Sequence, residues 1–400
     1  MFIEILIATI IGVFIGIFTG LIPGIHINLI SVAILTLSPI LLKFTSPIIL
    51  ATIIIAIAIT HTFLDSIPSI FLGAPDSSTA LAVLPGHRML LEGRGYEAVV
   101  LTVIGSLFSM ILLIVLLIPI SFAIPLFYPV IKTYIPYFLI LISGFLILRE
   151  RVSKFWAFFI FLLSGILGIA TLNFPNISQP LFPLFSGLFG TSTLLLSIQS
   201  KTEIPKQNVS EIIISKKESF KSIITAVFIG SFASTLPGLG PSQAAIIGTQ
   251  LMRKITNKGF LVLVGGLNTV NMVISIITLY TINKARNGAI VIMSLILESF
   301  SLNELITLIS VVLISGGIAT FLTVKLTKSF SKIITKVNYK VLVVSIISFV
   351  TLLVFLISGL FGLIVLITGT FIGIIPSLKN IGKNHLMGSL MLPIILFFLL

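Results

Sequence analysis

The only two aspartates of the chain, Asp65 and Asp76, lie in a long apolar region, within the tract THTFLDSIPSIFLGAPDSST at 60–79. His61 precedes Asp65 by four residues, so on a helix the two side chains share one face. Ionisable groups are costly in apolar surroundings and usually line a cavity or bind an ion or a proton. We interpret Asp65, His61 and Asp76 as candidate cation or proton sites. Alternatively, Asp76 caps a helix that starts near Ser77, and Asp65 pairs structurally with His61.

Two helix-length apolar runs are interrupted by the same dipeptide, Pro23-Gly24 in one and Pro237-Gly238 in the other. Proline removes a backbone donor, and glycine permits conformations that end a helix. Backbone groups freed in lipid must be satisfied by protein or by a water-lined cavity. The residues around the two breaks that could do this are Thr19, His26, Asn28, Ser31, Ser234, Thr235, Ser242 and Gln243.

A half-helix that begins after each Pro-Gly pair would direct free N–H groups and a positive dipole end toward an anion. The carbonyls before each break could coordinate Na⁺. We therefore expect an anion to contact Gly24, His26, Asn28, Pro237, Gly238, Gly240, Ser242 and Gln243, and a coupling ion to contact Ser234 and Thr235. The alternative is that each break only kinks a helix for packing.

A third polar tract, NTVNMVISIITLYTIN at 268–283, contains Asn268, Thr269 and Asn271. Neutral amides and hydroxyls bind carboxylates or Na⁺ without the cost of burying a fixed charge. These three residues are further candidates for the anion site. Hydrogen bonds that only serve packing are the alternative.

The amino-acid composition indicates the class of protein to which these candidate site residues belong. Hydrophobic residues make up 57% of the chain and charged residues 9%, with a mean hydropathy of +1.26. Soluble domains have roughly a quarter of their residues charged, and a helix crosses the hydrocarbon core with about 20 apolar residues. Runs of this kind lie at 3–22, 98–123, 133–148, 155–173, 180–198, 222–236, 260–282, 305–324, 341–357, 359–376 and 386–400.

We predict an all-α polytopic integral membrane protein with about 10–12 transmembrane helices, the first of them retained because no signal-peptide pattern precedes it. The chain has no cysteine, so disulfides and thiolate metal sites are excluded. We expect no metal site and no cofactor other than Na⁺ as a coupling ion.

The net charge of +13 is concentrated in loops. Most of the 24 Lys and Arg residues fall at 85–97, 149–154, 201–221, 325–340 and 379–383. The positive-inside rule then places these five loops in the cytoplasm and the N-terminus outside. A nucleic-acid partner is not expected, because no folded soluble module is present to carry a basic patch.

The sequence also indicates an internal repeat. At an offset of 214 residues, Val13, Phe14, Ile15, Gly16 and Phe18 are identical to Val227, Phe228, Ile229, Gly230 and Phe232. The charge pattern makes the two halves enter the membrane from opposite faces. We predict a first membrane repeat at 1–199, a cytoplasmic linker at 200–221 and an inverted second repeat at 222–400, with broken or re-entrant helices and a site between the halves.

The ordered motifs resemble the TctA family, the large permease subunit of tripartite tricarboxylate transporters. They are Gly20-Leu-Ile-Pro23-Gly24, Gly73-Ala-Pro75-Asp-Ser-Ser-Thr, Gly86-His-Arg-Met89, Gly93-Arg-Gly95-Tyr-Glu97-Ala98, PLFPLFSGLFGTSTLL at 180–195 and Leu236-Pro237-Gly238-Leu239-Gly240. The chain resembles a short, divergent member, since Pro85 stands where the family block has Asp and Asp76 where it has Gly. The resemblance implies a small membrane subunit and an extracytoplasmic solute-binding protein as partners.

These patterns predict a secondary active transporter, not an enzyme, in the cytoplasmic membrane. It would move a small organic anion such as a carboxylate together with Na⁺ or H⁺, by alternating access around the two Pro-Gly breaks. We also expect it to contact membrane lipids and to assemble as a homodimer. One alternative is a translocase for a lipid phosphate of the polyprenyl-phosphate type, with His87 and Arg88 at the cytoplasmic rim. The other is an intramembrane hydrolase using His61, Asp65, Asp76 and His87, although H-E-x-x-H and G-x-S-x-G motifs are absent.

Overall fold

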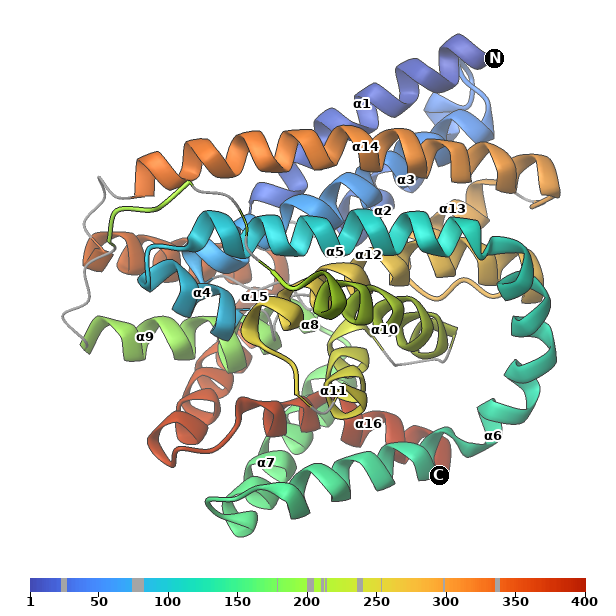
Figure 1. Ribbon diagram of the computed structural model, residues 1–400. Coiled ribbons are helices and arrows are strands. Elements are labelled where there is room, and N and C mark those ends of the chain that lie inside the picture. Colours follow the sequence, from blue (N-terminus) through green and yellow to red (C-terminus); the bar gives the residue numbers. More distant parts are fainter. Residues whose placement is uncertain are drawn as a thin grey trace.

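The structure is a computed structural model of the 400-residue chain. It describes residues 1–22, 27–73, 83–177, 179–199, 205–209, 212, 214–235, 240–252, 254–297, 299–334 and 339–400. Within these ranges the chain is almost entirely helical and contains no β-strand (Figure 1). The prediction of an all-α protein is confirmed.

In chain order the helices are α1 (Phe2–Leu21), α2 (Ile27–Leu41), α3 (Pro47–Leu64), the π-helical η1 (Pro68–Leu72), α4 (Val83–Leu91), α5 (Gly95–Val115), α6 (Leu117–Arg149), α7 (Lys154–Leu172), α8 (Leu181–Phe185), the π-helical η2 (Ser186–Thr191), α9 (Ser192–Gln199), α10 (Lys216–Thr235), α11 (Pro241–Leu251), α12 (Asn257–Ile282), α13 (Gly288–Leu297), α14 (Leu302–Ile333), α15 (Tyr339–Leu378), the 3₁₀ helix η4 (Lys383–Met387) and α16 (Gly388–Leu399).

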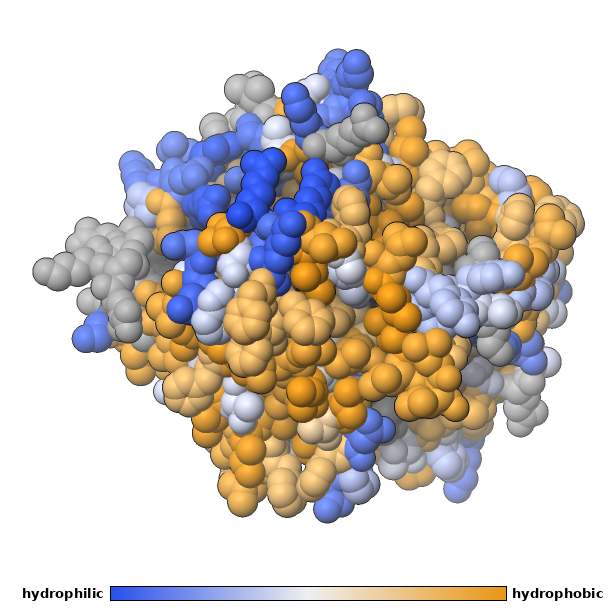
Figure 2. All heavy atoms as spheres, turned by 90° about the horizontal axis from the view of Figure 1, so that it is seen from below, coloured by the Kyte–Doolittle hydropathy of each residue, from blue (hydrophilic) through white to orange (hydrophobic). Residues whose placement is uncertain are grey.

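Seven of the described helices are long and apolar enough to cross a membrane: α1, α3, α5, α7, α12, α14 and α15. Large apolar side chains such as Phe14, Phe122, Phe155 and Phe371 are exposed on the outside of the molecule. Figure 2 shows a face that is mostly hydrophobic, with hydrophilic side chains gathered toward one edge. Exposed apolar surface of this extent is what a helix bundle presents to lipid.

The helix boundaries differ in places from the apolar runs of the sequence. α15 is interrupted at Gly359, whose φ of +65° lies in the left-handed region that glycine adopts readily. This interruption confirms the predicted boundary between the apolar runs 341–357 and 359–376. The predicted runs 98–123 and 133–148 are instead α5 and one long curved helix, α6 (Figure 1). Three internal prolines make α6 curve, because each removes a backbone hydrogen bond.

Two helices, α3 and α12, form the centre of the molecule and are the most buried of the seven. α1 lies against α3 through Gly12, Gly16 and Gly20, where an added Cβ would come within 2.7 Å of the Cβ of Ala56, Thr60 or Leu64. α10 packs on α12 in the same manner, with Gly230 against Leu267 and Val270. Glycines at four-residue spacing let two membrane helices approach closely.

The central helices also join the two halves of the chain. α12 crosses α5 so closely that Gly105 and Gly265 have no room for a side chain beside Val262 and Thr102 of the opposite helix. At this crossing the Ser106 hydroxyl donates a hydrogen bond to the Gly265 carbonyl (2.9 Å). α14 completes this inner group by packing on α3 and α5.

An outer group, drawn in the lower part of Figure 1, consists of α7, η2, α15 and α16. α7 packs on α16, with Gly168 against Ser389 and Gly388 against Phe161. α15 packs on η2, where Gly187 and Gly369 lie face to face. The inner and outer groups both combine segments from before and after the linker, so the two halves of the sequence interdigitate.

Candidate functional site

The Asp65 side chain lies in the interior of the inner helix group, at the end of α3. It is only 3% exposed. Its backbone N–H closes the last turn on the His61 carbonyl (3.0 Å), and its own carbonyl accepts hydrogen bonds from the Ser69 hydroxyl (2.8 Å) and N–H (3.3 Å). Because the backbone is held on both sides, the carboxylate has a fixed position at the junction of α3 and the following η1 turn.

The amide of Asn268, on α12, contacts this carboxylate. Asn268 Nδ2 donates a hydrogen bond to Asp65 Oδ2 (2.7 Å) and lies 3.3 Å from the Thr62 carbonyl. One turn away, the hydroxyls of Thr62 and Thr269 are 3.2 Å apart. The structure thus brings together three of the sequence candidates, Asp65, Asn268 and Thr269, where the central helices of the two halves cross.

His61 connects this crossing to the first helix break. Its Nδ1 lies 3.2 Å from the hydroxyl of Thr19, in the last turn of α1, and that hydroxyl in turn donates to the Gly16 carbonyl (3.1 Å). All three residues are buried. A change of conformation at the end of α1 would therefore act directly on the helical turn that contains His61 and Asp65.

The two interruptions that the Pro-Gly pairs predict fall where α1 gives way to α2 and α10 gives way to α11. The dipeptides themselves, with Gly24, His26, Pro237 and Gly238, lie outside the described residues, as does Asp76. The side chain of Asn28 is likewise outside them, although its backbone belongs to α2. The helix ends that flank both breaks are described.

At the second break, Ser234 and Thr235 are buried in the last turn of α10, where the Thr235 hydroxyl donates to the Phe232 carbonyl (2.8 Å). α11 then begins with Pro241 at its first position, and the Gln243 Oε1 accepts a hydrogen bond from the Gly240 N–H (2.9 Å). Ser242 and Gln243 are each 2% exposed. The start of α11 therefore points into protein and not toward solvent.

The side-chain amide of Gln243 has an N–H donor that none of the described residues accepts. Its Nε2 is buried and makes no hydrogen bond to any of the described residues, while its Oε1 is used by Gly240. A buried amide donor without an acceptor costs about 1–3 kcal/mol. Such a group at the N-terminal end of a helix is suited to an anionic oxygen, since the helix dipole favours the same charge.

Asn271 is less closely tied to this group of residues. It lies one turn after Asn268 on α12 and is half-buried, and its carbonyl accepts from the Ser275 hydroxyl (2.7 Å). Thr62, by contrast, contacts both Asn268 and Thr269, although the sequence analysis did not single it out. The signal was present, because Thr62 stands between His61 and Asp65 in the same polar tract.

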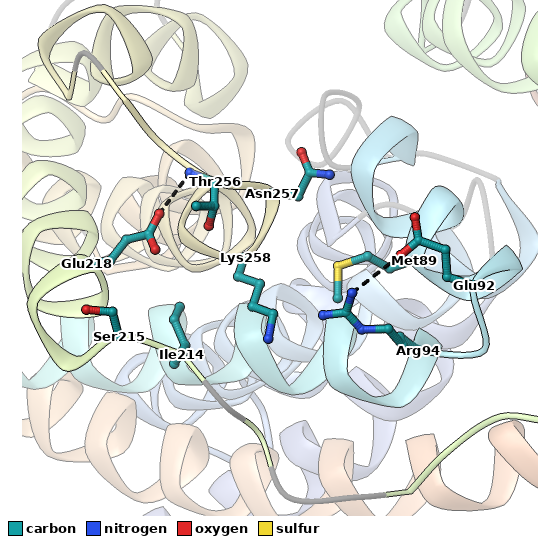
Figure 3. Close-up of a pocket in the computed structure, with 9 residues that line it drawn as sticks. All are labelled: Met89, Glu92, Arg94, Ile214, Ser215, Glu218, Thr256, Asn257 and Lys258. Carbon is teal, nitrogen blue, oxygen red and sulfur yellow. Dashed lines mark hydrogen bonds and ion pairs between the residues drawn. The ribbon is translucent and has the colours of Figure 1, made fainter.

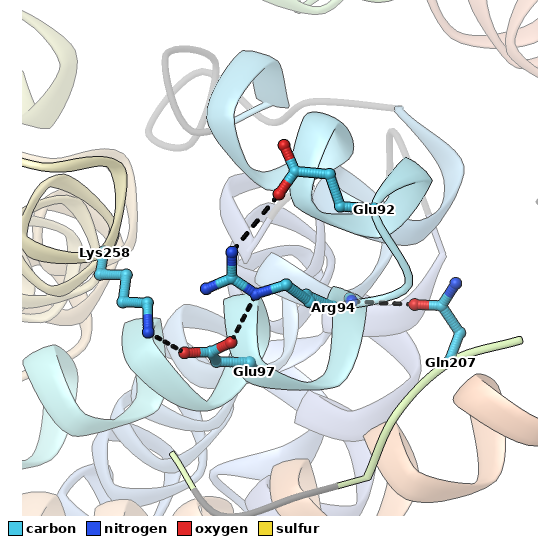
Figure 4. Close-up of polar contacts among 6 residues, drawn as sticks. Glu92, Arg94, Glu97, Gln207 and Lys258 are labelled. Carbon is cyan, nitrogen blue, oxygen red and sulfur yellow. Dashed lines mark hydrogen bonds and ion pairs between the residues drawn. The ribbon is translucent and has the colours of Figure 1, made fainter. Parts of the chain in front are cut away.

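A second polar region lies at the end of the inner group where α4, α5 and the start of α12 meet. Glu97 Oε1 lies 2.7 Å from Lys258 Nζ, and Glu97 Oε2 accepts from Arg94 Nε (2.9 Å) (Figure 4). The Gly95 N–H donates to the side chain of Gln207 in the linker (2.8 Å). The sequence analysis counted Arg94 among the basic loops and Glu97 in a family motif, but it did not predict that these groups join the two halves.

A cavity of about 310 Å³ opens beside these ion pairs (Figure 3). It is lined by Met89, Glu92, Arg94, Ile214, Ser215, Glu218, Thr256, Asn257 and Lys258. The Glu218 carboxylate accepts from the Thr256 N–H (2.8 Å), and Arg94 bonds both Glu92 and Glu97. Most charged side chains in this region form ion pairs or hydrogen bonds with one another. We interpret the region as a structural contact that holds the linker and the helix ends together.

The seven apolar helices and the carboxylate in their interior define a polytopic membrane protein. The sequence profile of the "Tripartite tricarboxylate transporter TctA family" matches residues 6–388. The chain is also 32% identical over 404 residues to an uncharacterized protein of Methanocaldococcus jannaschii, covering 98% of this chain and 99% of that protein. No solved structure matches it. The chain belongs to the TctA family of transport proteins.

Proposed function

We propose that the protein is a secondary active transporter that carries a small organic anion, such as a carboxylate, across the cytoplasmic membrane together with Na⁺ or H⁺. The observation that carries the proposal is the buried, unused amide nitrogen of Gln243 at the start of α11. Together with the first N–H groups of α11 it supplies donors and a positive dipole end, and no fixed positive charge. Because it has no fixed positive charge, such a site binds a carboxylate weakly enough to release it.

The Asp65 carboxylate is the proposed coupling group. A charge buried at membrane depth is tolerated mainly with a cation, a proton or a polar cavity beside it. The Asn268 amide donates a hydrogen bond to one oxygen of Asp65, which holds the carboxyl group in position for a coupling ion. Ser234 and Thr235, at the end of α10, are proposed to provide further oxygens for that ion.

Alternating access would follow from the way the helices are grouped. Both breaks adjoin helices of the inner group, and Thr19 and His61 link the first break to the α3–α12 crossing that holds the Asp65 carboxylate. Movement of the outer group against the inner one would then expose the site to each side in turn. A homodimer, a small membrane subunit and an extracytoplasmic solute-binding protein are proposed partners, the last two because the family is described as tripartite.

The translocase for a lipid phosphate fits the structure less well. It would use His87 and Arg88 as cations for the phosphate, but His87 is buried and its Nδ1 lies 3.0 Å from the Ile70 carbonyl. Burial lowers the pKa of the His87 imidazole, more than the bond to Ile70 raises it. The ring is therefore neutral at pH 7 and unsuited to bind a phosphate by its charge.

Uptake by reconstituted protein tests the proposal. Proteoliposomes would be given radiolabelled citrate, succinate and acetate under imposed Na⁺ or pH gradients, with a panel of neutral solutes as the comparison. We expect accumulation of at least one carboxylate, dependent on one of the two gradients and abolished by an ionophore for that ion. Absence of any carboxylate uptake, together with transport of a lipid phosphate or cleavage of a substrate, would overturn the proposal.

A further inference from the structure

An open groove of about 570 Å³ lies between the first part of α1 and the start of α3, beside the loop at 42–46 that joins α2 to α3. Its walls are apolar. Ile7 and Ile11 of α1 line one side, and Ile49 and Ile53 of α3 line the other. The side chains of Ile7 and Ile11 are 52% and 44% exposed, so the groove opens on the outside of the molecule and a ligand can enter it directly.

The order of small residues along α1 explains why a groove forms at this place. Gly12 is the first of the three glycines through which α1 contacts α3, and a Cβ added to it would lie 2.7 Å from the Ile53 carbonyl. One turn earlier the same face of α1 carries Ala8, and a further turn earlier it carries Glu4, and both line the groove. The two helices are therefore in contact from Gly12 onward and separate toward the start of α1.

The groove has a polar rim at the end where the α2–α3 loop lies, formed by Lys43, Thr45 and Ser46. Lys43 is exposed and forms no ion pair within the described part of the chain. Ser46 stands at the N-cap of α3, but its hydroxyl does not cap that helix. Glu4, on the α1 side, pairs with the N-terminal amine (3.2 Å). The rim thus offers a positive charge and a hydroxyl to a ligand.

The position of Lys43 in the sequence is unusual. It is the only Lys or Arg among the first 84 residues, and it lies on the side that the charge pattern predicts to be extracytoplasmic, where basic residues are disfavoured. A lysine that borders apolar residues at a membrane surface extends its ammonium group to the level of the lipid headgroups. The dipole of α3, which begins at the same rim, favours negative charge there as well.

Size and chemistry together select the occupant. A helix is about 10–12 Å in diameter, so two turns of a second membrane helix occupy roughly 850 Å³ or more, which exceeds the volume of the groove. A free phosphate ion would contact the rim and leave the isoleucine walls unused. A phospholipid matches both parts, because its phosphate is anionic and its chains are apolar.

We propose that this groove binds one phospholipid of the surrounding membrane. The phosphate contacts the Lys43 ammonium group and the Ser46 hydroxyl, and one hydrocarbon chain lies between the isoleucine walls of α1 and α3. The lipid fills the space where the two helices separate and supports the start of α1. It is a bound component of the fold and not cargo, so the inference goes beyond the proposed function and does not depend on it.

Crosslinking with a photoactivatable lipid tests this site. Purified protein in dodecyl maltoside would be irradiated with phosphatidylglycerol that carries a diazirine in one chain, and the labelled peptides identified by mass spectrometry. We expect label on α1 and on the start of α3. Unlabelled phosphatidylglycerol should compete for the site, whereas inorganic phosphate should not, and diacylglycerol with the same chains should compete less well because it lacks the phosphate.

Two variants separate the rim from the walls. Lys43→Gln should weaken phosphatidylglycerol binding about fivefold, the fold-change that corresponds to about 1 kcal/mol. Ile11→Trp fills the apolar part of the groove from an exposed position and should weaken binding at least about tenfold. The matched controls should bind like wild type. Lys379→Gln removes a cation that lies over Trp156, and Ile10→Trp makes the same change at a neighbouring exposed residue outside the groove.

Thermal unfolding in lipid-free detergent should give each variant the Tm of wild type, and a variant that unfolds early is set aside in favour of the other one. Unchanged labelling in folded Lys43→Gln and Ile11→Trp would overturn the inference, as would label spread evenly over the apolar helices. Competition by inorganic phosphate would reduce the rim to a simple anion site and overturn it too. Crosslinks from the groove to a second copy of the chain, in place of lipid, would identify a dimer contact and overturn it as well.

Discussion

The Asp65 carboxylate is the group through which we expect an ion gradient to act. Asp65→Asn keeps the shape of the side chain and the contact to Asn268 but removes the charge. The variant lacks the negative charge that attracts a cation, and a loss of about 1.4 kcal/mol already corresponds to tenfold weaker binding. A cation should therefore bind the variant at least about tenfold more weakly. Exchange of anion across liposomes should survive, while accumulation driven by a gradient should fall sharply.

Glu304→Gln is the matched control, because it neutralises a carboxylate that caps the exposed start of α14. Its accumulation should equal that of wild type. If Asp65→Asn also accumulates normally at equal protein and equal gradient, then Asp65 is structural. The coupling ion would then have to bind carbonyls and hydroxyls at the two helix breaks.

Glu150 provides a pH-dependent test of stability. Burial raises the pKa of its carboxyl, but the bond to His385 and the N–H groups of Val152, Gly382 and Arg151 outweigh burial and hold the pKa below the ordinary 4.5. Since the folded state depresses this pKa, the stabilisation is fully present above pH 4.5 and is lost as pH falls through the folded pKa. Glu150→Gln should therefore lower Tm at pH 7 and weaken its decline in acid.

Thermal unfolding in detergent, followed across the acid range, measures this effect. Glu4→Gln is the control, since Glu4 is exposed and pairs only with the N-terminal amine among the described residues. Its Tm should match that of wild type at pH 7. A Glu150→Gln protein as stable as wild type at pH 7 would show that the Glu150–His385 contact (3.1 Å) adds nothing.

At the scale of the helices, the interruptions between α1 and α2 and between α10 and α11 are expected to create the anion site. Replacing Pro23-Gly24 or Pro237-Gly238 by Ala-Ala would allow each pair to continue as one helix, which would consume the N–H groups that an anion needs. We expect either variant to be expressed and folded but to lose substrate binding. Binding near the wild-type level in a folded variant would mean that the breaks serve only packing.

The helix ends beside the breaks were predictable because proline and glycine act locally. The boundary at Gly359 followed from the apolar runs for the same reason. The contact between Asp65 and Asn268 was not predictable, because it joins residues 203 positions apart through the crossing of α3 and α12. Each residue was a candidate on its own, but their pairing depends on how α3 and α12 cross, which no local pattern in the sequence determines.

At the scale of the whole molecule, contacts between distant loops group the basic segments. Glu150, after α6, bonds to Gly382 and His385, after α15. Lys383 donates to the Thr193 hydroxyl (2.7 Å), and the linker residue Gln207 binds the start of α5. In Figure 1 the N-terminus lies at the opposite end from α4. This arrangement supports the prediction that the basic loops share one side of the membrane.

Single cysteines test that topology, because the chain has none of its own. The positive-inside rule places Lys216 and Lys332 in the cytoplasm, and Glu298 and the N-terminus outside. An impermeant maleimide added to intact cells should therefore label Glu298→Cys but not Lys216→Cys or Lys332→Cys, and lysis should make all three reactive. α1 and α10 would then enter the membrane from opposite faces, as inverted repeats require. Labelling of Lys216→Cys from outside would place both helices in the same orientation, and the two breaks could no longer be equivalent halves of one site.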